Sequence, residues 1–182
     1  RNGQLEKGAH ADTIILASIH HDTKEVRLAS VYRDTLTQQV SGKIQKANYA
    51  YFAGGPKDAI NMLNKNFDLD IQDYVTVDFK ALADVVDLLG GIELEVTDQE
   101  AKEINNYIDE TGTVTGKKAT HLTNGGTLKL DGVQAVTYAR IRKNAGGDYK
   151  RAERQQKVIA KVVEKAKTMD LKTINKIINK VF

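Results

Sequence analysis

The residues best suited to chemistry form a basic cluster between positions 140 and 156, in the segment RIRKNAGGDYKRAERQQ. Its basic side chains are Arg140, Arg142, Lys143, Lys150, Arg151 and Arg154. Guanidinium groups bind phosphate through paired hydrogen bonds, so such a cluster can compensate a strongly charged group. Three interpretations are open: a solvated surface, a nucleic-acid patch, and a pocket for a compact anion such as pyrophosphate.

Helical periodicity places part of this cluster on an inward face. A long helix is predicted from about Asp148, which stands where an N-cap would be, and its apolar stripe passes through Val158. Steps of three and then four residues back from Val158 reach Gln155 and Arg151, while Arg154 borders the same stripe. Because charged groups are rarely buried without compensation, this phase weakens the solvated interpretation. It leaves that interpretation and an anion site at a helix N-terminus about equally supported.

A second charged group is predicted at the open end of a hairpin. Residues 13–19 (TIILASI) and 26–32 (VRLASVY) are typical of antiparallel strands, and the first resembles strands that are buried on both faces. The register of such a hairpin places Asp12 opposite Arg33, next to Asp34. Taken singly, these residues are also explained as a strand-end cap and a local ion pair.

The remaining pattern predicts an α/β chain. A helix begins at Pro56, and a strand at 74–77 leads to a helix capped by Asp78. A strand at 92–96 follows, and this strand–helix–strand order predicts parallel pairing. A further helix is capped by Asp131. With the antiparallel hairpin added, the sheet should be mixed, with helices on both of its faces.

The bulk composition excludes several classes of protein. The 182 residues suit one domain, and a net charge of +3 with 6% aromatic residues and no tryptophan argues against a nucleic-acid partner. There is no cysteine and no histidine pair at helical spacing, so any metal would be a hard ion such as Mg²⁺ held by carboxylates. No segment could span a bilayer, but the chain begins at Arg1, and we expect a piece of a longer protein.

Six motifs stand in the order and spacing of the LytR-CpsA-Psr family, which the chain resembles from about Gly8 to the end of the long helix. They are ADTIILASI, LASVYRDT, KANYAYFAGG, LGGIELEV, LDGVQAVTYARIR and GGDYKRAERQQKV. The resemblance implies a three-layer α/β/α sandwich with a mixed central β-sheet, as a single domain over residues 1–182. It also implies a Gram-positive cell-membrane protein with a single-pass N-terminal anchor, missing here, and an extracellular catalytic domain.

The activity implied by the resemblance is phosphotransfer in cell-wall biogenesis. A glycopolymer such as capsule or teichoic acid would pass from a polyprenyl-pyrophosphate carrier to a hydroxyl of peptidoglycan. The implied pyrophosphate ligands are Arg33, Arg140, Arg142, Arg151, Arg154 and Gln155. The implied ligands of Mg²⁺, or of Mn²⁺ in its place, are Asp12 and Asp34. The implied catalytic residues are Arg33, Asp34, Arg140 and Asp148.

Three questions stay open at this point. The general base is either Asp34 or Asp148. The same site would serve a hydrolase that uses water as the acceptor, and a non-catalytic regulatory or lipid-carrier-binding module is a further alternative. The family often has an arginine two residues before the first aspartate, where this chain has His10.

Overall fold

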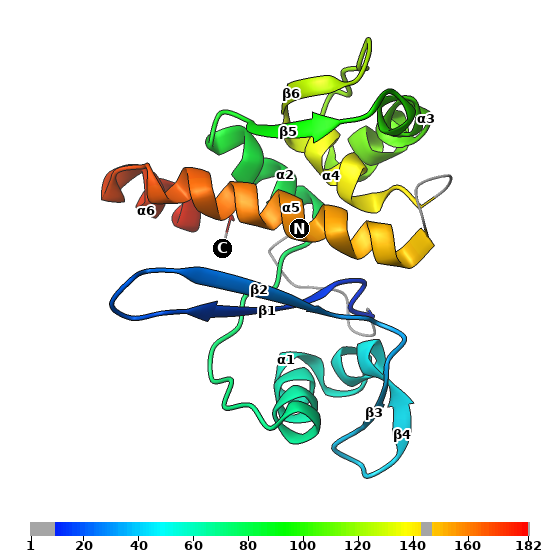
Figure 1. Cartoon of the computed structure of the whole chain (residues 1–182), viewed down its shortest axis with the longest axis vertical. Coiled ribbons are helices and arrows are strands. Elements are labelled where there is room, and N and C mark those ends of the chain that lie inside the picture. The colour runs from blue at the N-terminus through cyan, green and yellow to red at the C-terminus, as the bar shows by residue number, and fades with distance from the viewer. Residues whose placement is uncertain (1–9, 143–146, 182) are drawn as a thin grey trace. The chain divides into compact units, whose positions relative to one another are not determined.

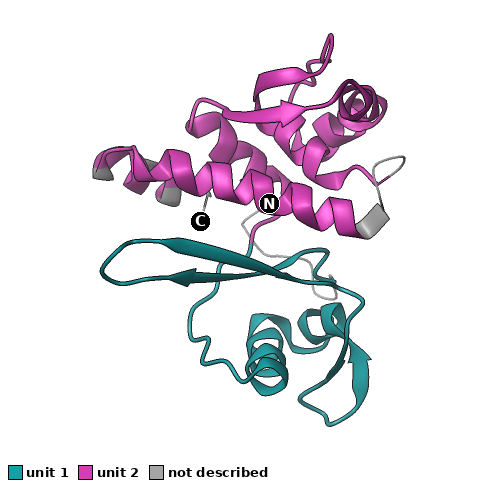
Figure 2. Cartoon of the chain, in the orientation of Figure 1, with its two compact units in different colours: residues 1–76 teal, residues 77–182 magenta. Residues whose placement is uncertain are grey.

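The computed structural model describes residues 10–142 and 147–181, and the chain divides into two compact units. Unit 1 comprises residues 1–76 and unit 2 residues 77–182 (Figures 1 and 2). The α/β class is confirmed, because helices and strands are interspersed along the chain. Within the described residues the strands form three antiparallel pairs rather than one mixed sheet. That both units form a single domain stays a prediction.

The hairpin of unit 1 has the predicted register. Strands β1 (Ile14–Ile19) and β2 (Val26–Val31) are antiparallel, with Ile14 opposite Val31. The expectation that β1 is buried on both faces is wrong, because its second half is exposed to solvent. Leu16 packs against the buried residues of a small core that also contains Met62.

The rest of unit 1 is a second, shorter hairpin followed by a kinked helix. Strands β3 (Leu36–Gln38) and β4 (Ile44–Lys46) pair antiparallel and lead directly into α1 (Ala47–Phe67). The helix is broken at Gly54 and Gly55, where Gly55 has a φ of 68°, and Pro56 follows. The predicted start at Pro56 is therefore confirmed for the second half of α1. Proline is tolerated there because it lacks the backbone N–H, which has no partner in the first turn of a helix.

Unit 2 has five helices and one strand pair among its described residues. The helices are α2 (Phe79–Leu88), α3 (Asp98–Thr115), α4 (Gly132–Arg140), α5 (Gly147–Lys167) and α6 (Leu171–Val181). Both predicted caps are confirmed, because the Asp78 carboxylate accepts a hydrogen bond from the Ala81 amide and that of Asp131 one from the Gln134 amide.

The predicted parallel pairing is wrong. The described residues 71–78 contain no strand, so the expected strand at 74–77 does not form. Strand β5 (Ile92–Val96) instead pairs antiparallel with β6 (Gly126–Leu130), which lies beyond α3 in the sequence. The alternating pattern of β5, with Ile92 buried and Glu93 exposed, suits such a half-exposed pair.

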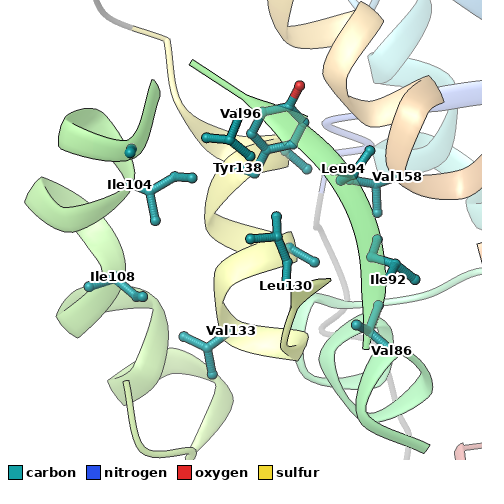
Figure 3. Packing of buried hydrophobic residues seen from close by; sticks show 13 residues of the cluster. Val86, Ile92, Leu94, Val96, Ile104, Ile108, Leu130, Val133, Tyr138 and Val158 are labelled. Atoms are coloured by element: carbon teal, nitrogen blue, oxygen red, sulfur yellow. The ribbon is translucent and has the colours of Figure 1, made fainter. Parts of the chain in front are cut away.

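The core of unit 2 is built around α4, whose residues from Gly132 to Ala139 are all buried. Figure 3 shows Ile104 and Ile108 of α3 beside the side chains of Leu130, Val133 and Tyr138. Gly132 permits close packing of α4 on α2, because a Cβ at this position would overlap the carbonyl of Ala83. No helix among the described residues is long and apolar enough to cross a bilayer.

An ionic network joins α2 to the N-terminus of α4. The Lys117 ammonium lies 2.7 Å from the carboxylate of Asp84 and 2.6 Å from that of Asp87. The other carboxylate oxygen of Asp87 accepts a hydrogen bond of 2.7 Å from the backbone amide of Gly132. Burial raises the pKa of Asp84, but hydrogen bonds from Lys117 and Lys80 outweigh it and hold that pKa below its ordinary value.

We expect the stabilising effect of Asp84 to disappear in acid. A carboxylate with a depressed folded-state pKa stabilises the fold above its unfolded-state pKa, and this contribution is lost as the pH falls through the folded-state pKa. Asp84→Asn should therefore lower the free energy of unfolding at neutral pH, and the difference should shrink below about pH 4. Urea unfolding from neutral pH to below about pH 4 measures this difference in the free energy of unfolding. The control is Glu95→Gln, at an exposed position of β5. A difference that stays constant into strong acid would contradict the prediction.

Candidate phosphate-binding site

The hairpin of unit 1 brings three predicted site residues together. The Arg33 guanidinium forms an ion pair with the Asp12 carboxylate across the open end of the β1–β2 pair. Its Nε lies 3.7 Å from the carboxylate of the neighbouring Asp34, whose other oxygen is 2.6 Å from the Lys46 ammonium. The predicted meeting of Asp12, Arg33 and Asp34 is confirmed. We call this group the Arg33 corner.

Helix α1 holds the main chain of this corner in place. The backbone amide of Asn48 donates a hydrogen bond of 3.1 Å to the Arg33 carbonyl, and the amide of Ala47 donates one of 2.8 Å to the Thr35 carbonyl. These amides belong to the first turn of α1, where amides have no partner within the helix. The helix start therefore serves to position Arg33, and Asn48 itself is buried.

His10, the departure from the family pattern, makes an aromatic contact. Its ring stacks on Phe52 of α1 with the ring centroids 4.6 Å apart, and Tyr49 contacts the same phenylalanine at 5.6 Å. The unit therefore has an imidazole against an aromatic group at the position where the resemblance leads us to expect arginine. The positive charge at this corner comes from Arg33 and Lys46.

The inward phase predicted for the start of α5 is confirmed. Arg151 is 5% exposed and Arg154 only 2%, although the sequence placed Arg154 merely beside the apolar stripe. Gln155 is half-buried, and its side-chain amide donates a hydrogen bond of 3.4 Å to the Ala139 carbonyl at the end of α4. Val158, one turn further along α5, lies in the core.

Arg154 contacts α3 and the residue that follows α4, both within unit 2. One terminal nitrogen donates a hydrogen bond of 2.7 Å to the Ile141 carbonyl, and the other lies 3.6 Å from the Glu100 carboxylate. Its guanidinium also stands 6.0 Å from the ring centre of Tyr138. Burial, assisted by the charge of Glu100, raises the pKa of Tyr138 to about 12, so this phenol stays neutral at physiological pH. Arg154 thus links α5 to the end of α4 and the start of α3.

Arg140 points to a different part of α3. One terminal nitrogen of its guanidinium donates a hydrogen bond of 2.9 Å to the Thr111 hydroxyl, and the other lies 3.0 Å from the Glu110 carboxylate. The guanidinium also covers the Phe79 ring at 4.7 Å. Thr111 and Glu100 are separated by about 16 Å along the helix, so Arg140 and Arg154 do not contact α3 at the same place.

Two predicted residues lie near or outside the limits of the described chain. Arg142 is exposed at the end of the segment that follows α4. The backbone of Asp148 belongs to the first turn of α5, but its side chain lies outside the described residues, as does all of Lys143. The choice of base between Asp34 and Asp148 stays open. That the Arg33 corner and the arginines of unit 2 share one diphosphate also stays a prediction.

The carboxylates at the Arg33 corner fit the donor set of a hard metal ion. Magnesium in phosphate-transfer sites is commonly held by one or two carboxylates together with phosphate oxygens and water. Asp12 and Asp34 supply two carboxylates around one guanidinium. Across residues 10–142 and 147–181, no group of three or more protein ligands that could hold a metal is found. Any Mg²⁺ held by Asp12 and Asp34 would take further ligands such as water and phosphate oxygens.

Sequence reasoning missed the partners of the arginines. Glu100 both completes the capping box of Thr97 at the start of α3 and contacts Arg154. The capping box was detectable, because a threonine followed three residues later by glutamate is its signature. The contacts of Thr111 and Glu110 with Arg140 were not detectable, because they join segments about 30 residues apart.

Comparison with known proteins places this geometry in context. A model of the LytR_cpsA_psr family matches residues 1–182. The chain is 33% identical over 171 residues to the polyisoprenyl-teichoic acid–peptidoglycan teichoic acid transferase TagU of Enterococcus faecalis, covering 93% of the chain and 51% of the relative. Biofilm regulatory protein A of Streptococcus mutans is 32% identical, with 88% and 40% covered.

A solved structure shows the same fold. The crystal structure of a Streptococcus agalactiae protein superposes with a TM-score of 0.79 at 29% identity, covering 96% of this chain and 60% of that one. The chain spans about half the length of the curated relatives it matches. The described elements therefore correspond to a fold already seen in crystals, within proteins that are longer than this chain.

Proposed function

Because the chain belongs to the LytR_cpsA_psr family along its whole length, we propose that it transfers a glycopolymer from a polyprenyl-pyrophosphate carrier to peptidoglycan. The observation that carries the proposal is the Arg33 corner, where a guanidinium and two carboxylates meet on a scaffold held by α1. The name of the Enterococcus faecalis relative, a teichoic acid transferase, supports the substrate class.

In the proposed reaction, a peptidoglycan hydroxyl attacks the phosphorus that bears the glycopolymer. A new oxygen–phosphorus bond forms, the bond from that phosphorus to the bridging oxygen breaks, and polyprenyl phosphate leaves with the electron pair. The hydroxyl proton passes to a carboxylate, either Asp34 or Asp148. Arg33 binds the non-bridging oxygens, on which negative charge accumulates. A role for Arg151 and Gln155 in the same step stays a prediction.

A divalent ion is part of the proposal. Asp12 and Asp34 would hold Mg²⁺, or Mn²⁺ in its place, and the ion would neutralise charge on the diphosphate. We place the domain outside the cell at the membrane, where a polyprenyl carrier and peptidoglycan are both present. The single-pass anchor stays a prediction.

A reconstituted reaction tests the proposal. Labelled lipid-linked glycopolymer is incubated with the chain, with and without peptidoglycan oligomers, and the products are separated by mass. We expect a joined product only when the oligomers are present, its loss on chelation with EDTA, and its return with Mg²⁺ or Mn²⁺.

Two other results would reject this assignment. Release of glycopolymer phosphate at the same rate without oligomers would indicate a hydrolase. Donor binding without any turnover would indicate a non-catalytic module, a role that the name of the Streptococcus mutans relative also suggests for that protein.

A further inference from the structure

The hairpin formed by β3 and β4, residues 36–46, buries two polar side chains and exposes three aliphatic ones. Side chains alternate between the two faces of a strand. Thr37 and Gln39 are buried and share a hydrogen bond of 3.0 Å between the Gln39 amide nitrogen and the Thr37 hydroxyl. Leu36 is 71% exposed, Ile44 59% and Val40, in the turn, 52%. An exposed group of aliphatic side chains on so short a hairpin marks an interaction surface.

This surface is held rigidly against its own unit. The side-chain amide of Asn66 in α1 donates a hydrogen bond of 2.9 Å to the Gln38 carbonyl and accepts one of 2.9 Å from the Gln38 backbone amide. Both outward hydrogen-bonding groups of Gln38, the last residue of β3, are therefore occupied, so this point of the β3 edge is not available to an added strand. Figure 1 shows the hairpin beside α1. What the hairpin offers a partner is its aliphatic face.

The charged residues of the hairpin itself are all basic. From Thr35 to Lys46 the chain contains two lysines and no acidic residue. Lys46, on the same face as Leu36 and Ile44, is paired with Asp34 of the Arg33 corner. Lys43 lies on the opposite face of the hairpin and is exposed beside the turn. Exposed aliphatic side chains together with a lysine at the turn suit the interface of a bilayer that contains anionic lipids, where the side chains enter the headgroup region and the long lysine side chain reaches phosphate from the turn.

The hairpin also begins directly at the proposed diphosphate site. Leu36 follows Asp34 by two residues, and Lys46 at the other end of the hairpin contacts Asp34. The diphosphate of a polyprenyl carrier lies at headgroup level while its chain lies in the hydrocarbon. A corner that binds this diphosphate must therefore reach the bilayer surface, and the hairpin is the part of unit 1 that leaves this corner with its aliphatic side chains exposed.

We propose that the β3–β4 hairpin docks on the surface of an anionic bilayer through Leu36, Val40 and Ile44, with Lys43 contacting lipid phosphate. The choice of a bilayer as partner rests on the proposed function. Docking holds the Arg33 corner at the depth of the carrier diphosphate. The hairpin is thus a membrane-binding element of unit 1, separate from any transmembrane anchor.

Vesicle flotation of the 182-residue chain tests the proposal. The vesicles contain equal parts of phosphatidylcholine and phosphatidylglycerol and no polyprenyl lipid, so binding does not require the diphosphate site. Changing Leu36 and Ile44 together to serine is expected to lower the partition coefficient by about tenfold or more, because two apolar side chains no longer enter the interface. The matched control is Val75→Ser, since Val75 is 75% exposed and lies outside the hairpin.

A charge variant separates the lipid contact from general hydrophobic adhesion. Lys43→Glu should weaken binding to the mixed vesicles and change little with phosphatidylcholine alone. Arg33→Ala should keep the part of vesicle binding that depends on Leu36 and Ile44 even if it abolishes donor turnover. Failure of docking and failure of the proposed transfer are thereby distinguished.

Three results would overturn the proposal. The first is no binding of the unchanged chain to the mixed vesicles, and the second is equal binding by the double serine variant. The third is self-association that the double variant loses without any vesicle binding, which would assign the surface to a second copy of the chain. If circular dichroism shows that the double variant is unfolded, Val40→Ser in the turn provides the same comparison.

Discussion

Replacing Arg33 with alanine is expected to lower donor turnover by about 10²–10³-fold while the chain stays folded. The guanidinium compensates charge that grows on the phosphate oxygens in the transition state, so kcat should fall more than KM rises. Without it, Asp12 and Asp34 would also face the diphosphate without their shared cation. Steady-state kinetics with lipid-linked donor measure both constants. Arg33→Lys should recover part of the activity, since it keeps the charge but not the paired hydrogen bonds.

The same hairpin provides a matched control. Arg27 lies on β2 and pairs with Glu25 through exposed side chains. Arg27→Ala removes the same chemical group from β2, six residues before Arg33, and we expect unchanged kinetics. If Arg33→Ala and Arg27→Ala were equally active, the assignment of the Arg33 corner to the diphosphate would be wrong. Equal unfolding midpoints for the two variants would show that lost turnover is not lost folding.

Replacing Arg154 with methionine should destabilise unit 2 by about 3 kcal/mol. Methionine keeps much of the apolar stem, but it leaves the Glu100 carboxylate and the Ile141 carbonyl without the guanidinium. Breaking one side of a buried charge pair is costly because the remaining charge keeps its desolvation penalty. Urea unfolding followed by circular dichroism measures the change. Adding Glu100→Gln should restore part of the loss, since the uncompensated charge is then removed as well.

Lys157 provides the control on the same helix. Its ammonium pairs with Glu153 at 2.9 Å on the exposed face of α5, where an ion pair contributes little. Lys157→Met should therefore leave the free energy of unfolding nearly unchanged. Under conditions where both arginine variants are folded, Arg154→Met should retain more donor turnover than Arg151→Ala. The reverse order would mean that Arg154 acts mainly on the donor and not through the helix contacts described above.

The sequence by itself determined the local features of this protein. The β1–β2 register follows from a short turn, because a hairpin with a defined centre fixes which residues oppose each other. That register alone brings Asp12, Arg33 and Asp34 together. The caps of α2 and α4 and the inward phase of Arg151 follow from spacing within single helices, where neighbours are set by backbone geometry.

Tertiary structure decided the features that join distant segments. Residues 92–96 pair antiparallel with residues 126–130 and not with 74–77, because pairing depends on which strand packing brings alongside. Arg140 and Arg154 go to separate points on α3, and helical phase contains no information about those partners. The β3–β4 hairpin buries Thr37 and Gln39, which hydrogen-bond to each other, and exposes Leu36 and Ile44, an orientation that hydrophobicity alone does not predict. Local geometry therefore specified which residues could bind phosphate, and packing decided which of the guanidiniums support the fold.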